Sequence, residues 1–465
     1  MAQSSPLAAA RRNSELGLVV MAAGITGVAY VLAALGKNST MPATIIPFLI
    51  ALLGLLVAAH IAVRIMASGA DATLLPLAVL LNGIGYVMIA RLNDERAAKQ
   101  TTWTFIAIVA FVITLALVQR PADLARYKWT FLFIGVGSLL LPLVPGIGSS
   151  VGGARIWISI GPVNIQPGEF AKIALALFFA AYLADNRELI AAGTGRLGRL
   201  HIPQMRYLLP ITGAWAFAIA VMVAEKDLGS ALLFFTLFTV MMWVATERAL
   251  FLLIGIALFA GAAVVAYNLF EVVRTRVQVM IDPWSQYQGK GYQPAQAMFA
   301  FANGGTGGTG LGMGSPNKIP AASTDYIFAA VGEEMGLIGA TAVLIAFLLL
   351  IGAGMRVAIR AERTFEKLLA TGLTTIIGMQ AFIITAGVLR VIPLTGITLP
   401  FMSYGGSSLL ANYVLLALLI RLSDSVARRT GDVPDSLTFS ERMEARALRK
   451  QAAREARALS QGGAR

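Results

Sequence analysis

The chain has 465 residues, of which 57% are hydrophobic and 13% are charged, and its mean hydropathy is +0.74. Soluble domains carry roughly 25% charged residues, so this composition indicates an integral membrane protein. The formal net charge is +13, but the basic residues lie in short loops between apolar segments and in the C-terminal tail. We therefore predict contact with anionic membrane lipids and no nucleic acid partner.

The sequence has no cysteine and only two histidines, His60 and His201. Disulfides and thiolate metal sites are therefore excluded. The two histidines lie far apart and lack the spacing of metal ligands, so we predict no metal site built from protein ligands.

Twelve apolar segments are long enough to span a membrane. The first follows MAQSSPLAAARRNSE and lacks a small-residue cleavage site, so we interpret it as an uncleaved helix and not as a signal peptide. The predicted fold is an all-α bundle of about twelve transmembrane helices, at 16–36, 43–63, 73–90, 101–118, 129–144, 169–183, 207–223, 228–246, 249–268, 328–353, 367–390 and 407–421.

The charges of the connecting loops predict how this bundle is oriented. With the N-terminus in the cytoplasm, the basic clusters that include Arg64, Arg126, Arg187 and Arg363 all lie inside. This arrangement obeys the positive-inside rule, and the even number of helices places the C-terminus inside as well. It assigns the long loop at 269–327 to the extracytoplasmic side.

The stretch at 152–172, GGARIWISIGPVNIQPGEFAK, is the first that could carry chemistry. Trp157 suits the headgroup zone, while Arg155 faces water. Glu169 and Lys172 stand three residues apart, on one face of a helix. They form either a local ion pair or part of a functional site, since ionisable groups inside a membrane are costly and are usually retained for a reason.

A second polar stretch, Glu225 to Gly229, reads EKDLG between two apolar helices. Asp227 stands where a helix begins. It acts either as a simple N-cap or as part of an outward-facing cavity.

The long loop combines acids with cations. A general base could come from Asp282, Asp325, Glu333 or Glu334. The alternative is a solvated loop with scattered charges. Its G-x-G-x-x-G pattern follows no strand, so we exclude a dinucleotide site. The cations that could clamp a phosphate or pyrophosphate are Arg274, Arg276, Lys290 and Lys318.

The fourth stretch, residues 393–408, reads PLTGITLPFMSYGGSS between two apolar helices. Such irregular backbone persists at membrane depth only when it is buried in protein or lines a cavity. Ser403 and Ser407 lie outside any G-x-S-x-G elbow and no histidine is near, so a serine hydrolase is not expected.

Together these stretches resemble the SEDS family, the FtsW/RodA/SpoVE proteins of bacterial shape, elongation and division. The matching pieces occur in the family's order: GARIWISIGPVNIQPGEFAK, EKDLGSALL, the DPW to GKGYQPAQAMFAFANGG region, TDYIFAAVGEEMG and PLTGITLPFMSYGGSS. The resemblance covers about residues 70–423, and the elongation branch, typified by RodA, is favoured over the division branch.

The resemblance implies a peptidoglycan glycosyltransferase of the bacterial plasma membrane. Members polymerise lipid II, an undecaprenyl-linked disaccharide pentapeptide, at the outer face, and they work with a class B penicillin-binding protein. No cofactor is certain, although a divalent cation could assist the leaving group. The residues expected to bind substrate are Arg155, Trp157, Gln166, Glu169, Lys172, Asp227, Tyr292, Gln293, Lys318, Asp325, Glu333, Glu334, Ser403 and Ser407.

The chain departs from the family in two places. Residues 16–68 form two additional N-terminal helices, which precede a SEDS-like core at 69–423; residues 1–15 and the basic tail at 424–465 are assigned to the cytoplasm. Many members carry an acid in D-P-x-x-D-P, where this chain has Gln286, and glutamine cannot act as a base. Asp282 is the default catalytic residue; otherwise another acid acts, or the protein polymerises poorly.

Two other functions stay open at this point. A bundle with polar groups at its midplane also suits a lipid II flippase. A non-catalytic scaffold that activates a penicillin-binding protein is the other alternative.

Overall fold

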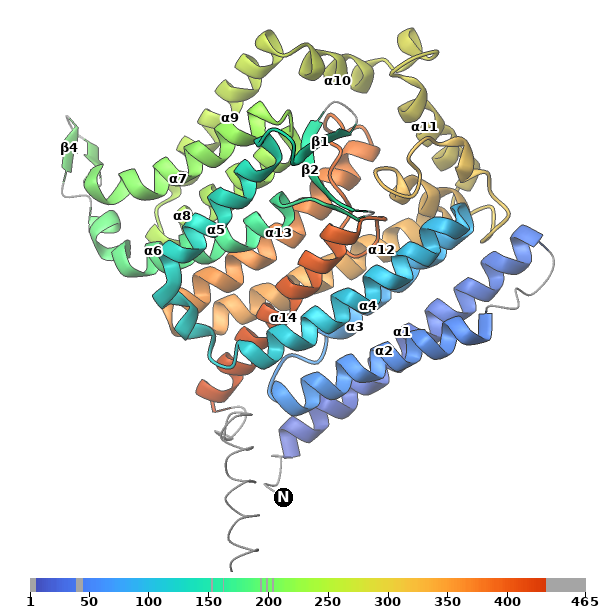
Figure 1. Cartoon of the computed structure of the whole chain (residues 1–465), viewed down its shortest axis with the longest axis horizontal. Helices are drawn as coiled ribbons and strands as arrows, with labels where there is room; N and C mark the ends of the chain where they lie inside the picture. The colour runs from blue at the N-terminus through green and yellow to red at the C-terminus, as the bar shows by residue number, and fades with distance from the viewer. Residues whose placement is uncertain are drawn as a thin grey trace, which may run out of the picture.

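The computed structural model describes residues 6–38, 45–151, 154–161, 163–192, 195–197, 200–202 and 205–431. Within these ranges the chain forms fourteen α-helices, four short 3-10 helices and five short strands. The long helices run side by side, with their connections gathered at two opposite ends of the bundle (Figure 1).

The helices in chain order are α1 (Pro6–Asn38), α2 (Ile45–Met66), α3 (Leu74–Leu92), α4 (Asp94–Leu117), α5 (Lys128–Leu140), α6 (Gly168–Ala192), α7 (Met205–Ala224), α8 (Leu228–Thr246), α9 (Ala249–Leu269), α10 (Glu271–Ile281), α11 (Tyr292–Gly304), α12 (Ile327–Arg360), α13 (Thr364–Val388) and α14 (Gly406–Arg429). The 3-10 helices are η1 (Pro121–Tyr127), η2 (Leu141–Leu143), η3 (Trp284–Gln286) and η4 (Pro316–Lys318). An antiparallel sheet joins β1 (Gly148–Val151), β2 (Ala154–Ile160) and β3 (Val163–Ile165), and a second pairs β4 (Gly195–Leu197) with β5 (Leu200–Ile202).

The prediction of a polytopic helical membrane protein is confirmed. Each of the twelve predicted segments falls on a helix, the shortest being α5 with 13 residues. Ten helical stretches among the described residues are long and apolar enough to cross a membrane. The stretch from 169 to 183 in α6 is buried almost throughout. Because other helices surround it, α6 tolerates charged residues that a lipid-facing helix would not.

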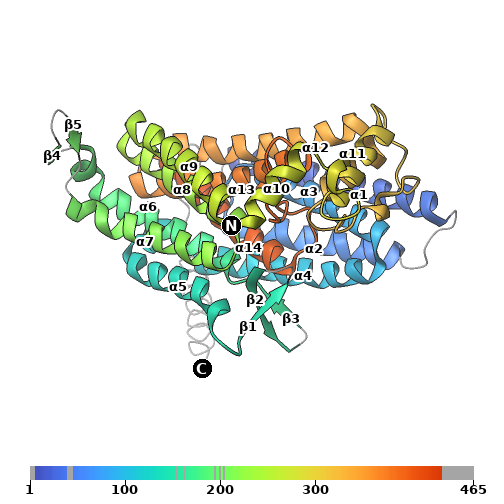
Figure 2. The ribbon, with the colours of Figure 1, turned by 90° about the horizontal axis from the view of Figure 1, so that it is seen from above.

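We call one end of the bundle the loop end. It comprises residues 141–151, 154–161, 163–167, 225–227, 270–326 and 389–405, together with the α3 to α4 turn. The opposite end, the tail end, comprises residues 67–73, 118–127 and 361–363, and the last turns of α12 and α14. Figure 2 shows the sheet of β1 to β3 projecting from one side of the bundle.

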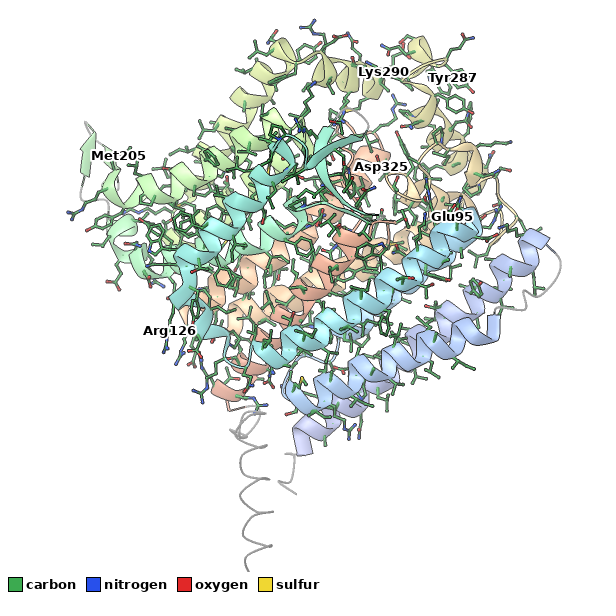
Figure 3. The ribbon with its side chains drawn as sticks, viewed as in Figure 1. Glu95, Arg126, Met205, Tyr287, Lys290 and Asp325 are labelled. Atoms are coloured by element: carbon green, nitrogen blue, oxygen red, sulfur yellow. The ribbon has the colours of Figure 1, made fainter. Side chains whose placement is uncertain are left out.

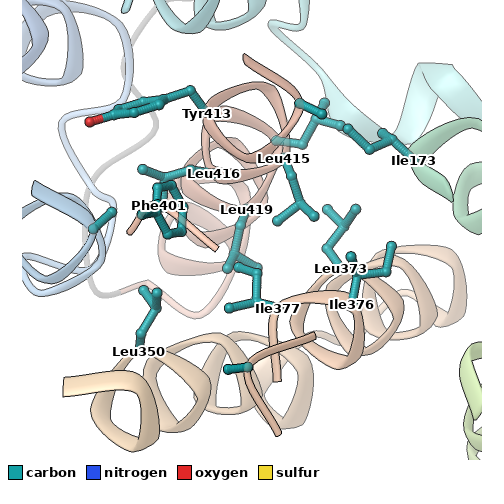
Figure 4. Packing of buried hydrophobic residues seen from close by; sticks show 14 of the residues in the cluster. Ile173, Leu350, Leu373, Ile376, Ile377, Phe401, Tyr413, Leu415, Leu416 and Leu419 are labelled. Carbon is teal, nitrogen blue, oxygen red and sulfur yellow. The ribbon is translucent and has the colours of Figure 1, made fainter. Parts of the chain in front are cut away.

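The centre of the bundle is formed by α13 and α14, which are the most deeply buried of the apolar helices. Leucine and isoleucine side chains of α13 face those of α14, with Leu350 of α12 and Phe401 closing the cluster (Figure 4). Tyr413 contacts Phe111 and Phe401 edge to face, and its hydroxyl accepts a hydrogen bond from Asn82 Nδ2 at 3.0 Å. Lipid solvates apolar side chains as well as the protein interior does, so the hydrophobic effect does not drive membrane helices together. Close packing of side chains, as seen here, holds them together instead.

The two additional N-terminal helices are fixed to the core at both ends of α1, which packs along α3. Near the tail end, Arg12 pairs with Glu15 and donates to the Ala70 carbonyl, and His60 Nδ1 lies 2.8 Å from Glu15 Oε1. At the loop end the Gly36 backbone lies against the backbone of Leu311. A Cβ on Gly36 would lie 2.2 Å from the Leu311 carbonyl oxygen.

Several boundaries differ from the prediction. The loop at 269–327 contains α10 and α11, and the five strands at 148–165 and 195–202 were not predicted. Helix α14 runs to Arg429, past the predicted end at 421, because its polar last turns pack inside the protein. The predicted ends of the chain, residues 1–5 and 432–465, lie outside the described residues.

We predict that Glu15→Ala destabilises the protein by about 3–5 kcal/mol, because it leaves Arg12 buried without its counter-charge. The measurement is the thermal unfolding of the purified full chain. Glu95→Ala, which removes only the exposed ion pair with Lys99, is the control. Equal unfolding temperatures for the two variants would contradict a stabilising role for this buried cluster.

Candidate active site

Two arginines attach helix α10 to the segment that follows α13. Arg390, just after α13, donates from Nε to the Met280 carbonyl at 2.9 Å and from Nη2 to the Ile281 carbonyl at 2.9 Å. These carbonyls belong to the last turn of α10, where the helix leaves them without partners. Arg276 donates to the Thr395 carbonyl at 3.1 Å. The α10 segment is therefore attached to the stretch between α13 and α14.

The turn between α10 and α11 is set by backbone geometry. Asp282 Oδ1 accepts from the Trp284 N–H at 3.0 Å and so stabilises the turn that leads into η3. The N–H groups of Gly289 and Gly291 both donate to the Gln286 carbonyl. A Cβ on Gly291 would lie 2.1 Å from the Pro283 carbonyl oxygen, so the turn closes only with glycine there.

A cavity of about 780 Å³ lies between α10, the start of α11 and the end of α13. Its charged lining consists of three cations, Arg276, Lys290 and Arg390, and one acid, Asp325. Tyr292 and Gln293 add polar groups to the wall. Figure 3 shows Lys290 on the turn after α10 and Asp325 closer to the bundle. The size suits a large ligand, and the charge suits an anionic one.

Asp325 is the carboxylate that lines this cavity. Burial raises the pKa of Asp325, against the opposing effects of a hydrogen bond with Thr324 and the positive charge of Arg276. Arg276 also interacts electrostatically with Asp227. A half-buried carboxylate with a raised pKa is a stronger base than a solvated one, which is the property a general base requires.

Asp227 caps α8, which is one of the two roles predicted for it from the sequence. Its Oδ1 accepts from the Ser230 N–H at 3.0 Å, and its Oδ2 accepts from the Ser230 hydroxyl at 2.6 Å. The neighbouring Glu225 is buried, and its Oε1 has no hydrogen-bond partner among the described residues. Burial, and then the proximity of Asp227, raises the pKa of Glu225 to about 8.

A buried polar network involves two further predicted residues. Lys172 Nζ lies 2.5 Å from Glu169 Oε2 and donates to Gln380 Oε1 at 2.9 Å. The predicted ion pair is confirmed, and its link to α13 shows that it joins two helices. The backbone N–H of Gln166 donates to Ser407 Oγ at 3.0 Å, which ties the start of α6 to the start of α14.

Other predicted residues hold the loop end together and do not line the cavity. Glu333 accepts from the Ser315 N–H, and Glu334 accepts from the Gly312 N–H and pairs with Arg91 at 3.0 Å. These contacts fix the glycine-rich stretch against the start of α12. Ser403 donates to the Thr324 carbonyl at 2.6 Å. Its hydroxyl thereby positions the residue just before Asp325.

Four predicted residues are placed away from the cavity lining. Asp282 is exposed and accepts the Trp284 N–H, and Lys318 is exposed at the end of η4. Arg155 and Trp157 lie on β2, where the Arg155 N–H donates to the Glu225 carbonyl. The sheet therefore covers the α7 to α8 turn.

Among the residues that the structure describes, no group of three or more potential ligands from His, Cys, Asp and Glu could hold a metal ion. The cavity offers one carboxylate, Asp325. Mg²⁺ is commonly bound by one or two carboxylates together with substrate phosphates, so Asp325 fits a cation that arrives with its substrate.

Arg390 was missed at the sequence level. It has left-handed backbone with φ of 61° and stands in the turn after α13. There the sequence ITAGVLRVIP, residues 384–393, has one arginine among apolar residues. A single arginine at the end of a membrane helix is common near headgroups, so its sequence context carried no specific signal.

The fold defines a multi-pass membrane protein with a cation-rich cavity at one end. Residues 72–428 match the FtsW/RodA/SpoVE family model, described as cell cycle protein. The chain belongs to this family, as its motifs predicted. The match begins after α2, so both additional helices precede it.

Individual relatives with known names also belong to this family. The chain is 44% identical over 429 residues to the peptidoglycan glycosyltransferase RodA of Mycobacterium tuberculosis, covering 90% of this chain and 92% of that protein. It is 34% identical over 368 residues to a probable peptidoglycan glycosyltransferase FtsW of Geobacter sp., covering 76% and 97%.

A structure described as showing the coordination of polymerization and crosslinking by a peptidoglycan synthase complex aligns with a TM-score of 0.63 and 26% identity, over 77% of this chain and 98% of that chain. The crystal structure of the Thermus thermophilus rod shape determining protein RodA aligns with a TM-score of 0.56 and 24% identity, over 76% and 96%, and supports the fold.

We predict that the unfolding free energy falls as pH rises from about 4.5 to 8, because the folded state holds the Glu225 proton more tightly than the unfolded chain does. The stabilisation from this proton is complete below pH 4.5 and is lost as pH passes through the folded pKa. Thermal unfolding of the purified chain between pH 5 and 9 measures the slope.

Glu225→Gln is expected to flatten this part of the pH profile, since the amide keeps the neutral form at every pH. Glu188→Gln, the same change at an exposed position of α6, is the matched control. An unchanged slope in Glu225→Gln would show that other groups cause the pH dependence.

Proposed function

We propose that this protein is a peptidoglycan glycosyltransferase that polymerises lipid II at the outer face of the bacterial plasma membrane. The observation that carries the proposal is the cavity in which Asp325 lies among Arg276, Lys290 and Arg390. The names of the relatives support the same reaction class. A role in elongation is favoured because the RodA relative is matched over a larger share of this chain than the FtsW relative.

The proposed reaction needs one base and a site for a leaving anion. A sugar hydroxyl of the acceptor attacks the anomeric carbon of the donor, and the new glycosidic C–O bond forms as the bond to pyrophosphate oxygen breaks. Asp325 takes the hydroxyl proton, and undecaprenyl pyrophosphate leaves with the bonding electrons. Arg276 and Lys290 stabilise the negative charge that develops on the pyrophosphate. A divalent cation bound by the phosphates themselves would supply further charge neutralisation.

We assign the base to Asp325 in place of the default Asp282. Asp325 lines the cavity, whereas Asp282 is exposed and accepts backbone hydrogen bonds that a protonated carboxyl would weaken. The family's usual acid position is Gln286 here, and Gln286 is not among the residues that line the cavity, whereas Asp325 is. An acid other than Asp282 was among the alternatives that the sequence left open.

The proposed orientation places the loop end outside and both termini in the cytoplasm. The lipid-borne donor and the cavity then meet at the outer leaflet. Basic residues collect at the tail end, where Arg356, Arg360 and Arg363 follow one another at the end of α12 and before α13, in keeping with a cytoplasmic location. Membrane lipids surround the bundle at its exposed apolar faces.

The proposed partner is a class B penicillin-binding protein, which crosslinks the peptides of the new strand. The structural relative solved in a peptidoglycan synthase complex, whose description names both polymerisation and crosslinking, supports a partner of this kind.

The proposal is tested by supplying lipid II to the detergent-solubilised protein with its crosslinking partner and separating the products by size. Glycan chains are expected. A flippase has no activity without a bilayer, so an absence of chains together with lipid II transport in vesicles would favour that function. Partner activation without chain synthesis would favour a scaffold.

We predict that Asp325→Asn lowers the polymerisation rate by about 10²- to 10⁴-fold, the usual contribution of a general base. Asp282→Asn, the matched carboxylate-to-amide change outside the cavity, is expected to reduce the rate by less than about tenfold. The readout is the initial rate of chain formation from lipid II, with unfolding temperatures compared to verify folding. A large loss in Asp282→Asn with near-normal activity in Asp325→Asn would reverse the assignment.

A further inference from the structure

A row of aromatic rings continues from the active-site cavity onto the surface of the α10 to α11 turn. Tyr292 lines the cavity, and its ring centroid lies 5.6 Å from that of Tyr287. The Tyr287 centroid lies 6.2 Å from that of Trp284, which in turn lies 5.6 Å from that of Phe299 on α11. Figure 3 shows Tyr287 farther out at the loop end than Asp325. We call Tyr292, Tyr287 and Trp284 the aromatic row, and it leads away from the cavity.

The two outer rings of the aromatic row face in nearly the same direction. The planes of Trp284 and Tyr287 differ by only 26°. Rings in face-to-face contact would lie about 3.5–4 Å apart, so a centroid distance of 6.2 Å means that the two rings are displaced sideways and do not cover each other's faces. Trp284 is also 49% exposed. The outer part of the row is therefore an accessible aromatic surface.

Hydrogen bonds hold the aromatic row in place before any ligand binds. Gln296 Nε2 donates to the Tyr287 hydroxyl at 3.1 Å, and the Tyr287 N–H donates to the Trp284 carbonyl at 3.2 Å. The Trp284 N–H donates in turn to Asp282. A surface that is already ordered loses less conformational entropy when a ligand binds.

The composition of the turn indicates what kind of ligand this surface fits. Residues 282–294 read DPWSQYQGKGYQP and include no aliphatic side chain other than proline. A turn that entered a bilayer or a protein core would carry leucine, isoleucine or valine. Here aromatic rings alternate with serine and glutamine, and Ser285 and Gln288 are exposed.

A sugar has the matching chemistry. The C–H bonds on the faces of a pyranose ring pack against the electron-rich face of an aromatic ring, while the hydroxyls around its edge form hydrogen bonds with amides and other hydroxyls. Neutral polar groups interleaved with aromatic rings therefore suit a neutral, polyhydroxylated ligand.

We propose that the aromatic row binds the glycan strand beyond the reacting sugars, with Trp284 and Tyr287 packed against successive sugar rings. Such a site presupposes the proposed function, because a strand that grows beside Asp325 must leave through the mouth of the cavity. Tyr292 belongs both to the cavity wall and to the row, so one strand contacts both without a break. Retention of the strand between additions lets many units be added before the product is released.

The test is the binding of a peptide-free glycan octasaccharide, labelled with a fluorophore at its reducing end, to the detergent-solubilised full chain. Fluorescence anisotropy measures the dissociation constant. The labelled octasaccharide is expected to bind at least about tenfold more tightly than the labelled disaccharide, because only the longer ligand reaches from the cavity to Trp284.

Variants separate this site from exposed aromatic surface in general. Trp284→Ala is expected to weaken octasaccharide binding about tenfold, and Trp284→Phe, which keeps a ring, by less than about threefold. Trp129→Ala is the matched control, since Trp129 is 46% exposed and contacts two aromatic rings but lies at the start of α5, near the tail end. Its affinity is expected to change by less than about twofold. Unfolding temperatures verify that each variant is folded.

Equal affinities of Trp284→Ala and Trp129→Ala would overturn the inference and assign Trp284 to the membrane interface, where exposed tryptophans are common. No binding of the octasaccharide, or equal binding of octasaccharide and disaccharide, would overturn it as well. Because binding needs no turnover, the two proposals fail separately. Glycan binding without chain synthesis from lipid II contradicts the proposed function, whereas chain synthesis with undiminished binding in Trp284→Ala contradicts only the role of the aromatic row.

Discussion

The attachment of α10 by Arg276 and Arg390 is the interaction on which the cavity depends. Helix α10 is short and amphipathic, and the preceding helix, α9, is almost entirely exposed on the bundle surface. Apolar packing therefore does little to hold α10 in place. The two arginines replace packing with directed hydrogen bonds to carbonyls at the end of α10 and at Thr395. The same two side chains supply positive charge to the cavity wall. The groups that position α10 are therefore also groups that favour an anionic ligand.

Several buried charges elsewhere are joined to a partner from another segment. Lys172 joins α6 to α13, Glu334 joins α12 to Arg91 of α3, and Asp424 of α14 accepts from the Gly69 N–H. Pairing is required because the cost of an isolated charge at membrane depth is several kcal/mol. The polar residues retained in this bundle therefore define which helices are neighbours, whereas its leucines and isoleucines fit many arrangements.

The sequence was sufficient to predict the helices and the family but not the internal geometry of the site. Apolar runs of spanning length identify α3 or α9 directly, since hydropathy depends on composition alone. The helices α10 and α11 were missed because their mixed composition resembles a loop, and the β1 to β3 sheet was missed because its strands are short. Asp282 was the default base because it precedes Gln286 in the motif. Only the fold shows that Asp325, 43 residues later, faces the cavity while Asp282 caps a turn.

The length of α1 gives the N-terminal addition a mechanical meaning. Its 33 residues span about 50 Å, which exceeds the roughly 30 Å of a hydrocarbon core. One end is anchored through Arg12 and Glu15, and the other rests on the backbone of the glycine-rich stretch that Glu334 also holds. The helix is thus longer than the apolar layer is thick. Its contacts with the core, at Arg12 and at Gly36, therefore lie towards opposite faces of the membrane.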